Sequence, residues 1–151
     1  MAFFFSKQEF FSTYEKSRIV DAIRESEQRT SGEIRVFIES RCRFVDPLDR
    51  AAEIFWNLQM DQTEDRNAVL VYVAMKDRQF AIFADEGIHK RAGEEFWSRE
   101  VAAMFVHFRR EHHIDAIVEV IGDIGQALIT HFPYNKDTDK NELPDDIVFG
   151  K

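Results

Sequence analysis

The chain lacks the residues and runs that define several common classes of small protein. Its 151 residues include one cysteine, Cys42, so neither an internal disulfide framework nor a thiolate-cluster zinc site can form. No apolar run approaches the roughly 18 residues that suggest a membrane-spanning helix. The apolar start at residues 1–5 ends at Lys7 and Glu9, too early for the apolar centre of a signal peptide. We therefore expect a cytoplasmic protein with no transmembrane segment.

Positive charge is also scarce. The chain has 20 lysines and arginines against 28 aspartates and glutamates, a formal net charge of −8, and no basic stripe. No nucleic-acid partner is therefore expected, whereas an acidic surface suits cations. The sequence contains no G-x-G-x-x-G, Walker loop, G-x-S-x-G or H-E-x-x-H motif, so the corresponding nucleotide-binding, hydrolase and zinc-protease classes have no support.

What is present is the composition of one globular domain with a polar tail. Apolar residues make up 44% and charged residues 32% of a length that can bury a single core. We expect one domain over residues 1–134 and an acidic tail over residues 135–151. The apolar Ile147, Val148 and Phe149 predict that the stretch 141–149 docks on the domain while residues 135–140 stay mobile. A purely solubilising tail is the alternative.

Periodicity and capping signals predict four helices and three strands. Ser12 and Glu15 form a capping-box pattern, and Asp46-Pro47 opens a second helix. Helices are expected over residues 13–29, 47–60, 94–110 and 115–132, and strands over residues 33–39, 68–74 and 79–84. A strand-helix-strand crossover followed by a hairpin predicts a three-layer α/β sandwich around a small mixed sheet, its first two strands parallel.

This topology gathers charged loops at the two ends of the sheet. One end collects oxygen-bearing side chains that suit a hard cation, namely Glu33, Glu64, Asp65, Asn67, Asp85 and Glu86. The alternative is that these residues are helix caps, turn formers and solvated charges. The other end collects cations that could hold an anion beside Cys42 or simply be scattered over the surface, namely Arg41, Arg43, Lys76 and Arg78.

The N-terminus is rich in phenylalanine, with Phe3, Phe4, Phe5, Phe10 and Phe11 close together. Packing of this segment on the domain is the first interpretation. The second is an anchor at a membrane surface or a contact with a partner, which the shortage of nearby lysine and arginine weakens.

Three segments of the chain resemble the TPM domain family. They are Thr30-Ser31-Gly32-Glu33-Ile34, Arg66-Asn67-Ala68-Val69-Leu70 and Asp85-Glu86-Gly87-Ile88, in the family's order and at fitting distances, and the resemblance covers roughly residues 12–133. It implies a Rossmann-like α/β/α sandwich, binding of a divalent metal, often calcium, and an acid phosphatase activity proposed for plant members. Lacking a leader and a C-terminal membrane segment, the chain resembles the stand-alone soluble bacterial type.

The resemblance also implies where the metal would bind. The family's Asp-Asn pair before the second strand falls on Asp65 and Asn67, and its turn after the third strand falls on Asp85 and Glu86. We take Asp65, Asn67 and Asp85 as candidate ligands, with Glu86 and Glu64 as weaker ones, and Ca²⁺ as the cation, with Mg²⁺ as the second candidate.

The expected function is that of a calcium-class metal-binding TPM-like domain, a non-catalytic or weakly catalytic interaction protein, monomeric and with a protein partner. The alternative is a metal-dependent acid phosphatase, for which the sequence identifies no catalytic residue. A third hypothesis is a membrane-surface adaptor that uses the Phe-rich N-terminus.

Overall fold

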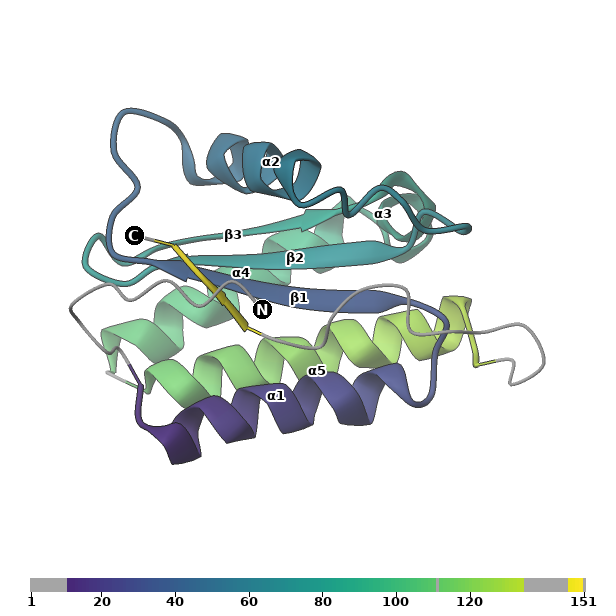
Figure 1. The fold of residues 1–151 in the computed structure, drawn as a ribbon, viewed down its shortest axis with the longest axis horizontal. Coiled ribbons are helices and arrows are strands. Elements are labelled where there is room, and N and C mark those ends of the chain that lie inside the picture. The colour runs from purple at the N-terminus through teal and green to yellow at the C-terminus, as the bar shows by residue number, and fades with distance from the viewer. Residues whose placement is uncertain (1–10, 111, 135–146, 151) are drawn as a thin grey trace.

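A four-stranded mixed sheet, ordered β3-β2-β1-β4, forms the centre of the computed structural model (Figure 1). The central strand β1 (Glu33–Glu39) pairs in parallel with β2 (Ala68–Ala74) on one side and with β4 (Ile147–Phe149) on the other. The strand β3 (Gln79–Ala84) pairs antiparallel with β2. The crossover and the hairpin expected from the sequence are therefore confirmed.

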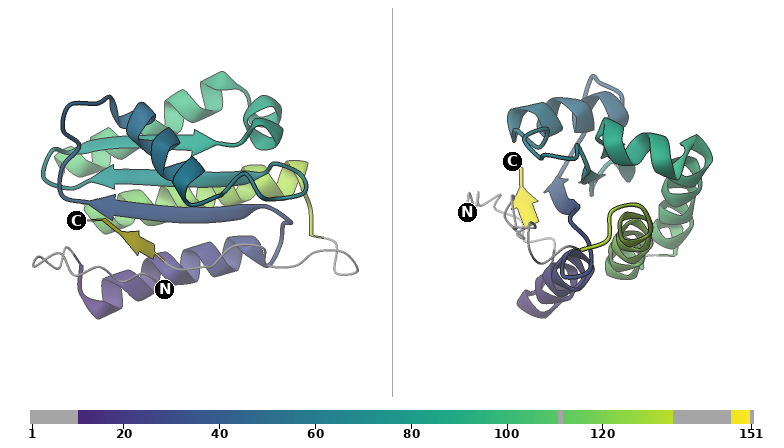
Figure 2. Two further views of the ribbon diagram at one scale, coloured as in Figure 1. Left: turned by 45° about the horizontal axis from the view of Figure 1, so that its top comes forward. Right: turned by 90° about the vertical axis from the view of Figure 1, so that its right-hand side faces the viewer.

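Helices cover both faces of the sheet. They are α1 (Thr13–Glu27), α2 (Pro47–Asn57), α3 (Glu86–Ala92), α4 (Glu94–Arg109) and α5 (His113–His131). Figure 2 shows α2 on one side of the sheet and α1, α4 and α5 on the other. This is the three-layer α/β/α sandwich with a small mixed sheet that the sequence predicted. The structure describes residues 11–110, 112–134 and 147–150, and within them no helix combines the length and apolarity needed to cross a bilayer.

Burial on both faces explains why the sequences of the two central strands are largely apolar. Every position of β1 and β2 is buried. Ile34, Val36 and Ile38 belong to the core beneath α1 and α5, while Phe37 and Tyr72 belong to the smaller core beneath α2. Since successive side chains of a strand face opposite sides of a sheet, two strands covered on both faces need apolar residues at nearly every position.

The helix starts follow the expected caps, with one exception. Ser12 and Glu15 exchange both hydrogen bonds of a capping box at α1, and Asp46 accepts from the backbone N–H of Leu48 at α2. The last helix, expected to begin with residue 115 near its N-cap, begins two residues earlier. Helix α5 begins at His113, and Asp115 lies in its first turn, where it forms an exposed ion pair with Arg18 at 3.1 Å.

One helix was missed altogether. Asp85 directly follows β3 and acts as the N-cap of α3, accepting a hydrogen bond from the Glu86 backbone N–H at 2.8 Å. The helix has only seven residues, and Gly93, at φ +88°, separates it from α4. So short an amphipathic stretch gives little periodic signal, because it presents one buried apolar side chain, Ile88.

The C-terminal strand β4 lies in the segment for which docking was expected. Val36, Phe37 and Ile38 of β1 pair with Ile147, Val148 and Phe149, and the Gly150 N–H donates to the Ile38 carbonyl at 2.7 Å. Ile147 and Phe149 are buried with the larger core. Of the N-terminal phenylalanines, Phe11 is buried as well, whereas residues 1–10 and 135–146 lie outside the described part of the chain.

Replacing Phe149 by alanine tests the contribution of this added strand. We expect Phe149→Ala to lower the free energy of unfolding by about 3 kcal/mol, because it empties a buried aromatic site between β1 and α1. The control Val148→Ala changes a half-buried position on the other face and should cost only about 1 kcal/mol. Equal losses in urea unfolding would contradict a core role for Phe149.

Candidate functional site

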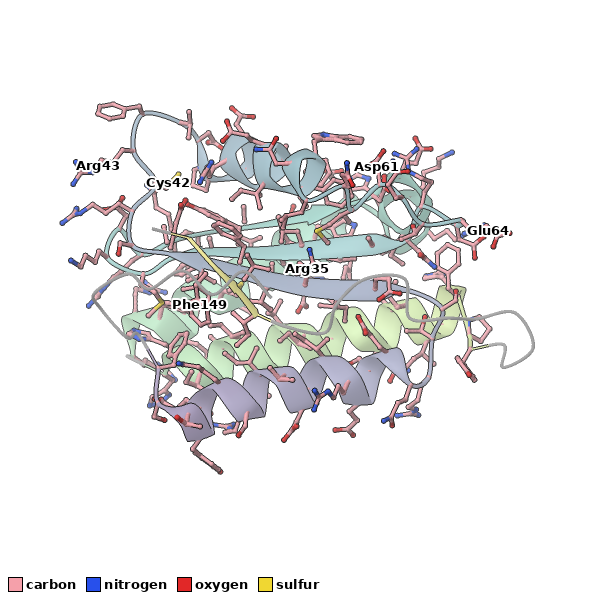
Figure 3. The ribbon with its side chains drawn as sticks, viewed as in Figure 1. Arg35, Cys42, Arg43, Asp61, Glu64 and Phe149 are labelled. Carbon is pink, nitrogen blue, oxygen red and sulfur yellow. The ribbon has the colours of Figure 1, made fainter. Side chains whose placement is uncertain are left out.

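Three of the five predicted ligands line one polar pocket at the end of the sheet where β2 begins. The pocket measures about 440 Å³ and is lined by Glu64, Asp65, Glu86, Gly87 and three cations, Arg66, Lys90 and Arg91. Figure 3 shows Glu64 at the outer tip of this end. The three acids are exposed, and the three cations nearby balance them. The pocket as a whole is therefore not strongly acidic.

Asp85 does not line that pocket and is bound to an arginine. Its carboxylate is 3% exposed and accepts two hydrogen bonds from Arg66, from Nε at 2.7 Å and from Nη2 at 2.8 Å. This bidentate pair raises the pKa of the Arg66 guanidinium. Asp85 is thus neutralised and oriented by the residue that separates Asp65 from Asn67 in the sequence.

Asn67 is buried between strands and only partly bonded. Its side chain is 1% exposed, its Nδ2 donates to Ser31 Oγ at 3.2 Å, and its backbone N–H donates to Thr63 Oγ1 at 3.2 Å. Within the described residues, its side-chain oxygen Oδ1 is buried and has no hydrogen-bond partner. An oxygen of this kind is costly to bury unless a ligand or water satisfies it.

Gly87 is the point where the first turn of α3 rests on the loop before β2. Its backbone N–H donates to the Arg66 carbonyl at 2.8 Å. A Cβ built on Gly87 would lie 2.2 Å from the Asp65 carbonyl oxygen and 2.6 Å from that of Arg66. The glycine in the Asp85-Glu86-Gly87-Ile88 segment is therefore required by close backbone approach, and it fixes how the two acidic loops meet.

The Thr30-Ser31-Gly32 segment has an equally structural role. Thr30 Oγ1 donates to the C-terminal carbonyls of α5, and the Gly32 N–H donates to Thr30 Oγ1 at 3.0 Å. A Cβ on Gly32 would lie 2.5 Å from the Leu128 side chain. The segment joins the end of α5 to the start of β1 and so positions Ser31, the partner of Asn67.

The described residues contain no group of three or more histidine, cysteine, aspartate or glutamate side chains arranged to hold a metal ion. The topology does bring the predicted ligands to one end of the sheet. Side-chain bonding then divides them, with Glu64, Asp65 and Glu86 on the pocket rim and Asp85 and Asn67 buried. Both carboxylate oxygens of Asp85 are hydrogen-bonded to Arg66, so a cation at this carboxylate would compete with the guanidinium charge.

The opposite end of the sheet contains a buried network that sequence reasoning missed. Glu39, the last residue of β1, accepts hydrogen bonds from Nε and Nη2 of Arg50, both at 3.0 Å, and from the Tyr72 hydroxyl. The hydrogen bond to Glu39 raises the pKa of Arg50, and burial, followed by the bond to Glu39, raises the pKa of Tyr72. No local sequence signal joins these three residues, because they come from three separate elements.

Of the cations predicted at that end, Arg41 is already paired with a carboxylate. Asp77 accepts from Arg41 Nη1 at 3.0 Å and from the Cys42 backbone N–H at 2.8 Å, which ties the loop after β1 to the turn after β2. Cys42 is buried and directs its Sγ to the Val45 carbonyl at 3.4 Å. Arg43 is exposed. Buried and bonded in this way, Cys42 has the surroundings of a structural thiol.

Comparison with known proteins identifies the family. The model of the TPM domain family matches residues 5–127, which is most of the chain, and the chain therefore belongs to the TPM domain family. No curated protein matches it. The three sequence segments that suggested the family now have defined positions, each at the acidic end of the sheet.

Solved structures show how widely the fold is shared. The BA42 protein of the psychrophilic bacterium Bizionia argentinensis is 41% identical, with a TM-score of 0.86 over 95% of this chain and 97% of its own. The N-terminal domain of the cg2496 protein of Corynebacterium glutamicum is 17% identical, with a TM-score of 0.59 over 82% and 76% of the two chains. An N-terminal domain from P. gingivalis is 16% identical, with a TM-score of 0.65 over 83% and 82%. The last two likenesses concern the fold alone.

Adding one methyl group to Gly87 tests the contact between the two acidic loops. We expect Gly87→Ala to destabilise the protein by about 1–3 kcal/mol, because the new Cβ would overlap two backbone carbonyls that cannot rotate away. The matched control is Gly122→Ala in α5, where a Cβ meets nothing within 4 Å. That change should stabilise by about 0.5–1 kcal/mol through helix propensity, and a stable Gly87→Ala variant in thermal melts would refute the contact.

Proposed function

We propose that this TPM domain binds a divalent cation of the calcium class at the loops before β2 and after β3, as a non-catalytic or weakly catalytic interaction protein. The ligands would come from Asp65, Asn67 and Asp85, with Glu86 and Glu64 on the rim. The observation that carries the proposal is the buried Asn67 Oδ1, which has no partner among the described residues. Amide and carboxylate oxygens are the ligands that Ca²⁺ and Mg²⁺ take in proteins.

Metal binding at Asp85 must compete with the ion pair that Arg66 forms with this carboxylate. Arg66 supplies the positive charge that the buried Asp85 carboxylate needs when no metal is bound. Arg66 is itself about one-third exposed, stands at φ +51°, and lines the open pocket. A cation entering the pocket would replace the guanidinium, and Arg66 would turn toward solvent. The proposed site is therefore one in which a side-chain cation and a metal compete for the same carboxylate.

The competition gives the metal proposal a direct test. We expect wild-type protein to bind Ca²⁺ with a dissociation constant of about 10⁻⁵–10⁻³ M, since few carboxylates are present. Arg66→Gln should tighten binding by about tenfold because the competing charge is lost. Asp85→Asn, which still caps a helix, should abolish it. Titration followed by backbone NMR shifts measures all three.

The control for this titration is Asp49→Asn, an exposed change in the first turn of α2, at the other end of β1. It should leave Ca²⁺ affinity unchanged. The proposal fails if Ca²⁺ moves no resonance of residues 64–67 and 85–87 at millimolar concentration, or if Asp85→Asn binds as the wild type does. Mg²⁺ titrated in parallel would rank the two cations.

Weak or absent catalysis is the second expectation. Phosphoryl transfer needs a nucleophile or metal-bound water together with cations around the transferred group. Here the pocket brings acids and cations together, but none of its lining residues offers a hydroxyl, thiol or imidazole, and Arg66 is paired with Asp85. We expect hydrolysis of p-nitrophenyl phosphate, with either cation, to stay far below about 1 s⁻¹. Faster turnover that Asp85→Asn removes would favour the metal-dependent acid phosphatase instead. A cytoplasmic location, a monomeric state and a protein partner stay predictions.

A further inference from the structure

The loop between β1 and α2 places a large aromatic side chain in solvent. Phe44 is 99% exposed and stands at φ +69°, a conformation that is a genuine outlier for a bulky residue. Its neighbours Val45 and Leu48 are 47% and 51% exposed. Neither the exposure nor the backbone conformation of Phe44 benefits the fold, and such outliers point to a functional contact.

The local structure explains why Phe44 projects outward. Cys42 turns into the small core, and its Sγ donates to the Val45 carbonyl at 3.4 Å, which closes a turn with residues 43 and 44 at its tip. In Figure 3, Cys42 lies on the inner side of this loop, and Arg43 points away from the molecule. The apolar tip is therefore held at its base by the buried Cys42.

The surroundings of the tip are basic although the protein is acidic. Residues 41–45 and 76–78, which we name the Phe44 surface, carry four cations and one anion, a net charge of +3 on a chain of net charge −8. Asp77, the one anion, holds the two segments side by side through its hydrogen bonds to Arg41 and to the Cys42 backbone. Cations therefore outnumber anions around the exposed phenylalanine, although the exposed Asp46, the N-cap of α2, follows directly.

We propose that the Phe44 surface docks on an anionic lipid bilayer. Phe44 and Val45 insert at the boundary between headgroups and acyl chains, and Arg43, Lys76 and their neighbours contact lipid phosphates. A lipid surface fits this loop because the Phe44 ring, 99% exposed at the tip of a turn, can enter a bilayer without a matching pocket. Long, exposed cations likewise suit many anionic headgroups in no fixed arrangement.

The position of the pocket lined by Glu64, Asp65 and Glu86 favours this orientation. Figure 3 shows Arg43 and Glu64 at opposite ends of the molecule. With the Phe44 surface on the membrane, the exposed acids of that pocket face away from the anionic headgroups, where screening makes their repulsion small. Docking and cation binding therefore use separate residues and can be measured independently.

Vesicle flotation of the full chain tests the proposal. Wild-type protein should float with phosphatidylcholine vesicles that contain phosphatidylglycerol, less so at high salt, and not with phosphatidylcholine alone. Phe44→Asn should lower the partition coefficient by about tenfold, since it removes the inserted ring while Asn tolerates the positive φ. Arg43→Gln should lower it by about fivefold.

Two controls make the result specific. Tyr134→Asn removes a 48% exposed aromatic ring beside the start of β1, at the opposite end, and should float as the wild type does. Replacing Phe3, Phe4 and Phe5 by serine tests the N-terminal segment and should preserve most binding. The proposal is overturned if wild-type protein ignores anionic vesicles, if Phe44→Asn floats normally, or if only the N-terminal variant loses binding. Unchanged melting temperatures exclude misfolding as the cause of any loss.

Discussion

The burial of β1 and β2 on both faces is the constraint on which the other features depend. Two strands without a solvent face need helices on both sides, which sets the three layers. They also force polar residues within β1 into the interior. Glu39 is tolerated there because it accepts hydrogen bonds from Arg50 of the covering helix α2 and from Tyr72 of the neighbouring strand β2. A buried charge without such partners would be strongly destabilising.

The same sheet divides the charged loops between two ends, each with its own arrangement of charge. At the acidic end, Arg66 and Asp85 form a bidentate pair beneath a pocket whose exposed acids and bases balance. At the basic end, Asp77 ties two loops together and leaves cations around an exposed phenylalanine. Metal binding is therefore proposed at one end and surface docking at the other. The pocket at the first end holds both acids and cations, but its lining residues supply no hydroxyl, thiol or imidazole for phosphoryl transfer.

Several residues of the segments that revealed the family have a structural role. Gly32 and Gly87 stand where a Cβ would collide with a side chain and with backbone carbonyls, respectively, and Thr30 bonds the end of α5. Such residues locate the loops of the candidate site without supplying ligands. Resemblance could therefore identify the family and the fold, whereas the state of each ligand oxygen depended on contacts that the motif does not encode.

Except for β4 and α3, the sequence predicted the strands, the helices, the topology and the end of the sheet to which each charged loop belongs. These follow from local signals such as apolar runs, the caps at Ser12 and Asp46, and short connections. The folded structure was needed to show that Arg66 neutralises Asp85 across 19 residues, that Glu39 binds Tyr72 across 33, and that Phe44 points into solvent. Side-chain pairing between distant elements depends on three-dimensional distance and burial, and neither quantity is written in the local pattern of residues.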